Sequence, residues 1–188
     1  MDDPDGMRVE LVASVDGGGD AVSSLHSVTL ALHEPSVTAQ LLTEDMGLHA
    51  TGASGERFRF EAGEGGHART VDLAGSPAGT RGRMGPGAIH HVAFRLADEA
   101  RQLEWHAHLA AVEAGVSPVM DRCYFHSIYF REPGGVLFEL ATDPPGFAVD
   151  EPIDALGRTL CLPPWLESAR PQIERALPPI TVPARRDT

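Results

Sequence analysis

The chain has 188 residues, of which 42% are hydrophobic and 22% are charged, a composition typical of a folded globular protein and not of a disordered one. Its formal net charge of -12 argues against nucleic acid and anionic membrane surfaces as partners, because both are themselves negatively charged. No apolar run is as long as the roughly 20 residues that cross a bilayer, and no secretory leader pattern is present, so we expect a cytoplasmic protein. Two cysteines, Cys123 and Cys161, are too few for a disulfide framework and lack the spacing of a thiolate zinc site.

An internal repeat runs along the chain. Three segments read as a turn followed by a strand with an acidic residue at the same place: 3–13 (Glu10), 66–75 (Asp72) and 132–142 (Glu139). Two further segments, 25–32 and 89–96, align with each other as the first strands of two units. Such self-similarity at a fixed period indicates that one structural unit is repeated.

Between the first and the last strand of each unit, the sequence predicts one helix and two short strands. Apolar residues at helical spacing, each set followed by a glycine, predict helices over 36–46 and 98–114. Short alternating runs predict strands over 57–60 and 124–130. Each unit therefore has the order βαβββ, and we predict an α+β fold of paired βαβββ units with curved mixed sheets.

The boundaries of the predicted regions follow from these elements. The two units cover 25–75 and 89–145, and a Gly- and Pro-rich linker over 76–88 joins them. Residues 1–14 read as the last strand of an incomplete preceding unit, so we expect an N-terminally truncated version of the fold. A C-terminal tail over 146–188 contains a predicted helix from Trp165 to Ala176, for which we expect a packing role.

The predicted strand over 6–13 needs a partner, because the other strands of its unit are absent. Its backbone donors and acceptors, and the apolar side chains of Met7, Val9 and Leu11, require cover. We therefore expect either a homodimer that pairs these edges or pairing with the missing N-terminal unit.

Side-chain alternation selects one histidine and one carboxylate as a candidate metal pair. His91 lies on the less apolar face of its strand, and Glu139 lies opposite the apolar face of its own strand, between Leu137 and Ala141. One imidazole nitrogen and one carboxylate oxygen suit Fe(II), Mn(II), Zn(II) or Ni(II). The alternative is that His91 is a hydrogen-bonded core histidine and Glu139 a solvated acid, and spacing alone does not decide between the two.

Other candidates have weaker support. Glu10 and Asp72 occupy the positions that correspond to Glu139, but Ser27 stands where Asp72 would need a histidine, so we interpret both acids as surface residues. His126 interrupts an aromatic strand; a ligand role is the alternative, but Ile128 on the same face favours a structural role.

Three segments, 89–95, 121–143 and 162–166, carry a resemblance to a known family. They are similar to motifs of the vicinal-oxygen-chelate superfamily, which contains glyoxalases, bleomycin-resistance proteins and extradiol dioxygenases. Within it they resemble the ring-cleaving dioxygenases that act on hydroquinones. The resemblance extends from Gly6 to Pro178 and corresponds to somewhat more than the C-terminal half of a full-length member. It implies βαβββ units around a metal and a non-haem Fe(II) dioxygenase that opens a dihydroxylated aromatic ring with O₂.

The resemblance also implies roles for single residues. In that family two histidines and one glutamate hold iron, and the motif match places the second histidine at His91 and the glutamate at Glu139. A base, an arginine and a tyrosine near the metal match His90, Arg122 and Tyr129. These would take the phenolic proton of the substrate, hold developing negative charge, and donate a hydrogen bond to bound oxygen, respectively. The implied cofactor is Fe(II), with Mn(II) or another divalent metal as the alternative, and the implied partners are a small aromatic substrate and O₂.

Two features depart from the family pattern. The first histidine of the iron triad belongs to an opening unit that has no counterpart here, and Ser27 occupies the corresponding position in the first unit present. Strict alternation also points His90 away from His91, so the role of His90 requires a local twist or bulge. We therefore expect the chain alone to be inactive, or nearly so, toward hydroquinones. A glyoxalase-like metal-dependent isomerase or lyase, and a non-catalytic module that binds a small aromatic, remain alternatives.

Overall fold

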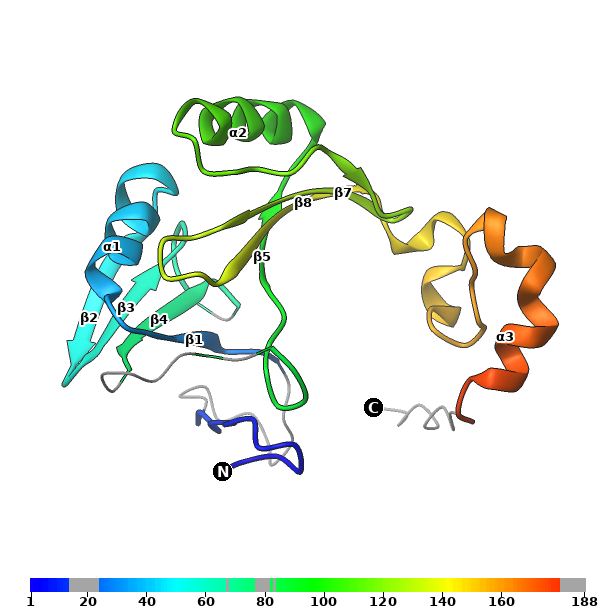
Figure 1. Cartoon of the computed structure of the whole chain (residues 1–188), viewed down its shortest axis with the longest axis horizontal. Coiled ribbons are helices and arrows are strands. Elements are labelled where there is room, and N and C mark those ends of the chain that lie inside the picture. Colours follow the sequence, from blue (N-terminus) through cyan, green and yellow to red (C-terminus); the bar gives the residue numbers. More distant parts are fainter. Residues whose placement is uncertain (14–23, 67, 77–81, 83, 180–188) are drawn as a thin grey trace.

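The computed structural model describes residues 1–13, 24–66, 68–76, 82 and 84–179. Two βαβββ units follow one another in this part of the chain, as predicted (Figure 1). Residues 77–81 and 83 of the predicted linker and residues 180–188 of the predicted tail lie outside the described residues. No helix among the described residues is long and apolar enough to cross a membrane.

The helices and strands lie close to their predicted positions. The first unit consists of β1 (Ser27–Leu32), α1 (Pro35–Gln40) with a π-helical continuation η1 (Leu41–Asp45), β2 (His49–Ser54), β3 (Arg57–Glu61) and β4 (Thr70–Gly75). The second unit consists of β5 (Val92–Leu96), α2 (Glu99–Ala111), β6 (Met120–Asp121), β7 (Phe125–Arg131) and β8 (Leu137–Pro145).

The local sequence explains where the helices begin. Pro35 stands in the first turn of α1, where its missing N–H costs no hydrogen bond. Asp98 caps α2, because its carboxylate accepts a hydrogen bond from the backbone N–H of Arg101 at 2.9 Å. Glu99 in the first turn and His108 in the last turn have the side-chain types that the helix dipole favours at those ends.

Each unit forms one four-stranded mixed sheet. The strand orders are β1-β4-β3-β2 and β5-β8-β7-β6, and in both sheets the first and last strands of the unit pair in parallel while their other neighbours are antiparallel. The two mixed sheets, each with its helix, form the α+β architecture that the repeat predicted. Because the two orders match, every position in the first sheet has a counterpart in the second.

The apolar faces of both sheets form a common core. Leu30, Leu73 and Phe60 come from the first unit, and Phe138 and Leu140 come from the second; all are at most 5% exposed. These residues share one side of their strands, so the alternating residues lie on the opposite side of each sheet. In the second sheet that opposite side carries Glu139.

The turn between β7 and β8 joins the two units. Its Glu132 is 2% exposed and accepts hydrogen bonds from the backbone N–H groups of Gly134 and Val136, at 2.8 and 2.7 Å. It also accepts one at 2.5 Å from the hydroxyl of Thr38, a fully buried residue of α1. A Cβ at Gly134 would come within 2.6 Å of Leu32, so this glycine permits the close approach of the turn to the first unit.

The Glu132→Ala substitution should lower the free energy of unfolding by about 3 kcal/mol, because it leaves a buried hydroxyl and two backbone donors without their acceptor. Urea denaturation measures the change. Glu104→Ala is the control: Glu104 forms an ion pair with Arg101 in which both side chains are well exposed, and its removal should change stability by no more than about 1 kcal/mol. Equal effects of the two substitutions would contradict the joining role of Glu132.

The N-terminal segment is not part of either sheet. Residues 6–13 form no strand of these sheets, and the segment folds back on itself through an isolated bridge between Asp2 and Arg8. Pairing of this segment with another unit or with a second copy stays a prediction. The backbone hydrogen bonds of this segment are local, such as the one that Val9 N–H donates to the Met1 carbonyl at 2.8 Å. Leu11 remains 66% exposed.

Most of the C-terminal tail lies apart from the sheets, and Phe147 at its beginning contacts Tyr124 and Phe125 at one end of the second sheet. Its helical turns η2 (Phe147–Val149), η3 (Ile153–Ala155) and η4 (Pro164–Ala169) and its helix α3 (Arg170–Ala176) form an arm at one end of the molecule, apart from the two sheets (Figure 1). Trp165, at the start of the predicted helix, is 71% exposed, and Leu177 is 47% exposed. The predicted helix is present as η4 and α3, and these two side chains leave its packing role a prediction.

Candidate metal centre

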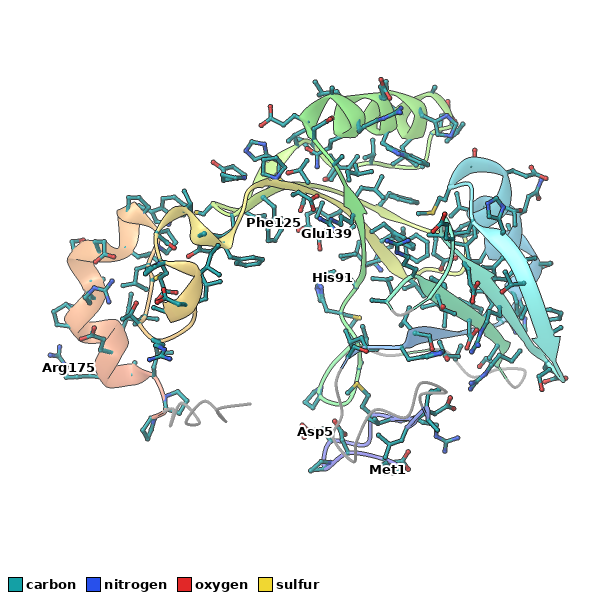
Figure 2. The ribbon with its side chains drawn as sticks, turned by 180° about the vertical axis from the view of Figure 1, so that it is seen from behind. Met1, Asp5, His91, Phe125, Glu139 and Arg175 are labelled. Carbon is teal, nitrogen blue, oxygen red and sulfur yellow. The ribbon has the colours of Figure 1, made fainter. Side chains whose placement is uncertain are left out.

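The pairing of three strands brings the predicted metal pair together. Glu139 of β8 lies opposite Tyr129 of β7 in the antiparallel register and opposite Ala93 of β5 in the parallel register. His91 directly precedes β5 and is two residues from Ala93, so it continues the same side of the sheet. Figure 2 shows His91 and Glu139 on the side of the second sheet that faces away from α2.

The contact between the two residues is direct. Nε2 of His91 lies 2.8 Å from Oε2 of Glu139. The Glu139 side chain is 4% exposed, whereas that of His91 is 37% exposed. A buried carboxylate thus presents one oxygen to an imidazole at the border of solvent, and the interpretation of Glu139 as a solvated acid is wrong.

The second oxygen of Glu139 is held by two hydroxyl groups. Oε1 accepts hydrogen bonds from Ser127 Oγ at 2.5 Å and from the Tyr129 hydroxyl at 2.6 Å. Ser127 is completely buried. Sequence reasoning missed Ser127, although its position two residues before Tyr129 places it on the same side of β7. Oε2 is therefore the oxygen that faces His91.

Arg122 extends this set of contacts through Tyr129. Its Nε donates a hydrogen bond of 3.2 Å to the Tyr129 hydroxyl, and its guanidinium carbon lies 5.3 Å from the centre of the tyrosine ring. The guanidinium therefore places positive charge beside the phenol, within the range of a cation–π contact.

His90 also belongs to the cluster. Its Nδ1 lies 2.9 Å from Nδ1 of His91, and the two rings are nearly perpendicular, at 88°. Because β5 begins at Val92, His90 lies two residues before the strand, and strict alternation does not determine the side on which its ring lies. The structure thus brings together all five predicted site residues: His90, His91, Arg122, Tyr129 and Glu139.

The donor set suits two positions of a divalent metal. An imidazole nitrogen and a carboxylate oxygen converge, and the opposite atom of each group is already hydrogen-bonded, which is the arrangement that orients metal ligands. A bound cation would replace the direct contact between these two donor atoms. In the part of the chain that the structure describes, no group of three or more His, Cys, Asp or Glu side chains is close enough to hold a metal ion.

The first unit has a different arrangement at the corresponding place. Asp72 of β4 lies opposite Arg59 of β3 and opposite Thr29 of β1, the positions that correspond to Tyr129 and Ala93. Arg59 donates to both carboxylate oxygens of Asp72, at 2.8 and 2.9 Å. Asp72 is 1% exposed, so our interpretation of it as a surface acid is wrong. The arginine neutralises the buried acid here.

Glu10, the third acid of the repeat, joins the same group of charges. Arg57 donates to both of its oxygens, at 2.7 and 2.8 Å, and also lies 4.0 Å from Asp72. The hydrogen bonds from Arg57 lower the pKa of Glu10, and those to Asp72 raise the pKa of Arg59. The surface position predicted for Glu10 is confirmed, since its side chain is 48% exposed.

Arg59→Met should lower the free energy of unfolding by about 2 kcal/mol or more, because it removes the close partner of a buried carboxylate. Adding Asp72→Asn to this variant should recover part of the loss, because the remaining buried charge is then removed. Arg8→Met serves as the control, since Arg8 and Asp2 form a well-exposed ion pair. Urea denaturation measures all four proteins, and a double variant no more stable than Arg59→Met would refute the ion-pair explanation.

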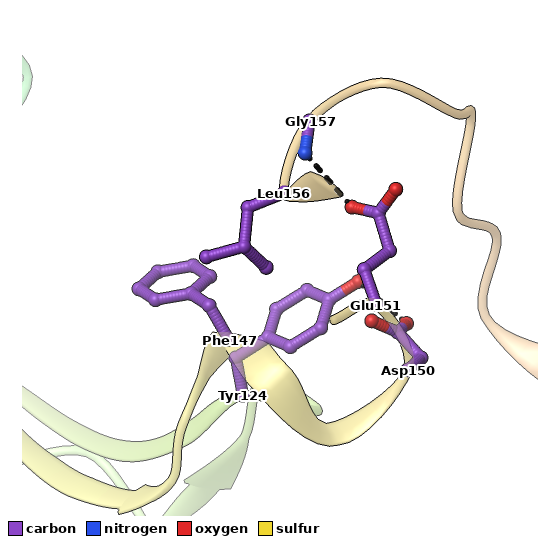
Figure 3. Close-up of a pocket in the computed structure, with 6 residues that line it drawn as sticks. All are labelled: Tyr124, Phe147, Asp150, Glu151, Leu156 and Gly157. Carbon is purple, nitrogen blue, oxygen red and sulfur yellow. Dashed lines mark hydrogen bonds between the residues drawn. The ribbon is translucent and has the colours of Figure 1, made fainter. Parts of the chain in front are cut away.

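A small pocket lies where the C-terminal arm meets the second sheet (Figure 3). Tyr124 and Phe147 stack there at 5.3 Å between ring centres, with Leu156 completing the apolar wall. The Tyr124 hydroxyl donates to Asp150 at 2.9 Å. This hydrogen bond, followed by burial, raises the pKa of Tyr124 to about 12. The pocket joins the arm to the sheet and contains none of the five predicted site residues.

In a Tyr129→Phe background, the phenolate absorbance of Tyr124 should titrate with a midpoint of about 12. Asp150→Asn should lower this pKa toward about 10, the ordinary value for tyrosine. The folded-state pKa lies above the unfolded one, so the hydrogen bond stabilises the fold fully below pH about 10 and loses that effect as the pH rises through about 12. Absorbance at alkaline pH measures the midpoint, and an unchanged midpoint in Asp150→Asn would contradict the assigned cause.

Comparison with known proteins identifies the relatives of the chain. No family model matches it. Over 194 residues it is 42% identical to MhqO of Bacillus subtilis, whose name provisionally describes a ring-cleaving dioxygenase; the match covers 97% of this chain and 61% of MhqO. Over 164 residues it is 32% identical to a chlorohydroquinone/hydroquinone 1,2-dioxygenase of Sphingobium indicum, covering 84% of this chain and 50% of that protein. The chain thus spans between half and about three fifths of the length of these relatives.

Solved structures agree with this result. A Bacillus subtilis protein whose name provisionally describes a dioxygenase superposes with a TM-score of 0.77 and 46% identity, over 82% of this chain and 49% of that one. A lactoylglutathione lyase from Agrobacterium tumefaciens superposes with a TM-score of 0.51 and 20% identity, over 64% of this chain and 94% of that one, which shows the shared fold alone.

The chain therefore has the vicinal-oxygen-chelate fold of solved glyoxalase and bleomycin-resistance proteins, which is the fold that the resemblance implied. It is also a homologue of proteins named as ring-cleaving dioxygenases, of which it matches a part.

Proposed function

We propose that the chain is the part of a ring-cleaving non-haem Fe(II) dioxygenase that supplies one histidine and one carboxylate ligand. The observation that carries this proposal is the contact of 2.8 Å between His91 Nε2 and Glu139 Oε2, with Arg122 and Tyr129 beside it. The proposed substrate is a hydroquinone-like dihydroxylated aromatic. The printed name of the Sphingobium indicum relative supports this substrate class.

Each residue of the site has a chemical task in this proposal. When bound, Fe(II) would supply the redox chemistry that joins O₂ to the aromatic ring, held by His91 and Glu139. The N–H at His91 Nδ1 would then donate a hydrogen bond to Nδ1 of His90, 2.9 Å away, which fixes the tautomer that leaves Nε2 available as a ligand. The neutral His90 ring then carries its own proton on Nε2, so His90 would accept the phenolic proton of the substrate at Nδ1 when this hydrogen bond is released. The guanidinium of Arg122 would stabilise the resulting negative charge.

We further propose that a third ligand comes from another βαβββ unit, outside the residues of this sequence. Two protein ligands leave a metal site incomplete, and among the described residues no group of three or more His, Cys, Asp or Glu side chains could hold a metal ion. The exposed apolar side chains of the arm, among them Trp165 and Ile153, support the presence of a further partner, because large apolar groups at the surface favour contact with another protein surface.

His91→Ala and Glu139→Gln should each weaken Fe(II) binding by more than about 100-fold, since changes to residues behind the ligands already cost about 10–100-fold. Metal bound after anaerobic loading of the purified chain measures the effect. His126→Ala is the matched control, because His126 pairs with Glu99 at 2.9 Å and contacts no site residue. Fe(II) binding that is the same in all four proteins would refute the proposed centre.

Oxygen uptake with hydroquinone tests the second half of the proposal. The chain alone should consume O₂ slowly or not at all, because one metal ligand is missing, and activity should rise when a polypeptide with the further unit is supplied. Rapid uptake by a homogeneous monomer would contradict the requirement for another unit.

A further inference from the structure

We propose that Ser127 is a positioning residue that holds Glu139 in its metal-binding orientation and thereby leaves the single phenolic proton of Tyr129 available to the substrate or to oxygen. This inference rests on the proposed function, because it assigns a task to a residue behind the proposed metal centre. Neither the repeat nor the family motif assigned a role to Ser127.

The strand register explains how Ser127 reaches Glu139. Ser127 and Tyr129 are two residues apart on β7 and share one side of the sheet, but only Tyr129 lies directly opposite Glu139. Ser127 lies opposite Ala141, whose small side chain leaves room for the hydroxyl to reach the diagonal neighbour. The resulting hydrogen bond to Glu139 Oε1 measures 2.5 Å.

The number of protons distinguishes the two hydroxyl groups. A phenol has one proton, and that of Tyr129 is donated to Glu139 Oε1 at 2.6 Å, while Arg122 donates to the tyrosine oxygen. Tyr129 can therefore donate to substrate or oxygen only by releasing Glu139. If Tyr129 alone held the carboxylate, this change would free the metal ligand at the moment of reaction.

Burial identifies Ser127 as the permanent donor. Ser127 has no exposed surface, so its hydroxyl cannot reach a substrate, whereas Tyr129 is only partly buried. With Ser127 in place, Oε1 keeps a donor when Tyr129 turns away, and Oε2 keeps its direction toward His91. A buried carboxylate oxygen without any donor would instead reorient toward other polar groups.

The first unit supports this division of tasks. The positions that correspond to Ser127 and Tyr129 are Arg57 and Arg59, and both guanidinium groups lie within 4.0 Å of Asp72. Two residues at this spacing on the third strand thus face the acid of the last strand in both units. In the first unit both are cations, and in the second both are hydroxyl donors, which neutralise no charge and so leave the carboxylate available to a metal.

Cobalt(II) provides the test, because its visible absorption reports both affinity and coordination geometry. Ser127→Ala in the full chain should weaken Co(II) binding about 10-fold or more and alter the absorption bands. Ser127→Thr, which keeps the hydroxyl, should restore binding to within about 3-fold of the wild type. Tyr129→Phe should weaken binding less than Ser127→Ala does, because Ser127 remains. Ser117→Ala, which removes a hydroxyl bonded to the backbone of Tyr129 and not to Glu139, is the matched control and should bind like the wild type.

Thermal unfolding of each variant shows whether it is folded. A positioning role for Ser127 is supported over a purely structural role only if Ser127→Ala alters the absorption bands and Ser127→Thr restores binding. Ser127→Ala with wild-type affinity and bands would overturn the inference while leaving the metal centre intact. Tyr129→Phe that binds Co(II) as weakly as Ser127→Ala, or a folded Ser127→Thr without rescue, would also overturn it. If His91→Ala binds Co(II) as well as the wild type does, the proposed function fails and the inference fails with it.

Discussion

A carboxylate buried in the middle of a β-sheet needs a permanent partner, and this requirement organises the second unit. Glu139 is 3% exposed and lies between two strands, where an isolated negative charge would lose most of its hydration. Its two oxygens meet the requirement differently. One is saturated by the hydroxyl groups of Ser127 and Tyr129, and the other faces an imidazole. The direction of that second oxygen is the geometric basis of the proposed metal centre.

The first unit meets the same requirement with an internal cation. Asp72 occupies the position that corresponds to Glu139, and Arg59 neutralises it through two hydrogen bonds. An arginine carries its positive charge at every physiological pH, so this acid has no need of a metal. Tyr129 stands at the matching position of the second unit and adds no charge. One repeat thus has a structural ion pair where the other has a candidate ligand, although the two sheets have the same strand order.

The packing between the units supports the site from a distance. Glu132 lies in the turn that connects β7, which carries Ser127 and Tyr129, with β8, which carries Glu139. Its hydrogen bonds within the turn and to Thr38 tie both strands to the first unit. Since Tyr129 and Glu139 meet through the register of these two strands, the turn that sets the register also sets the distance between the two side chains.

The repeat, the βαβββ order and the pairing of His91 with Glu139 could be predicted from sequence, because strand periodicity determines which residues share a side of a sheet. Local pattern did not determine which groups would meet that side from neighbouring strands. Asp72 was interpreted as a surface acid because its partner Arg59 lies 13 residues away, and the sheet register alone brings them together. Ser127 was missed for the same reason. The isolated N-terminal bridge and the exposed arm could not be predicted from the order of helices and strands either. Which surfaces are covered depends on contacts between distant parts of the chain, and these exist only in the folded protein.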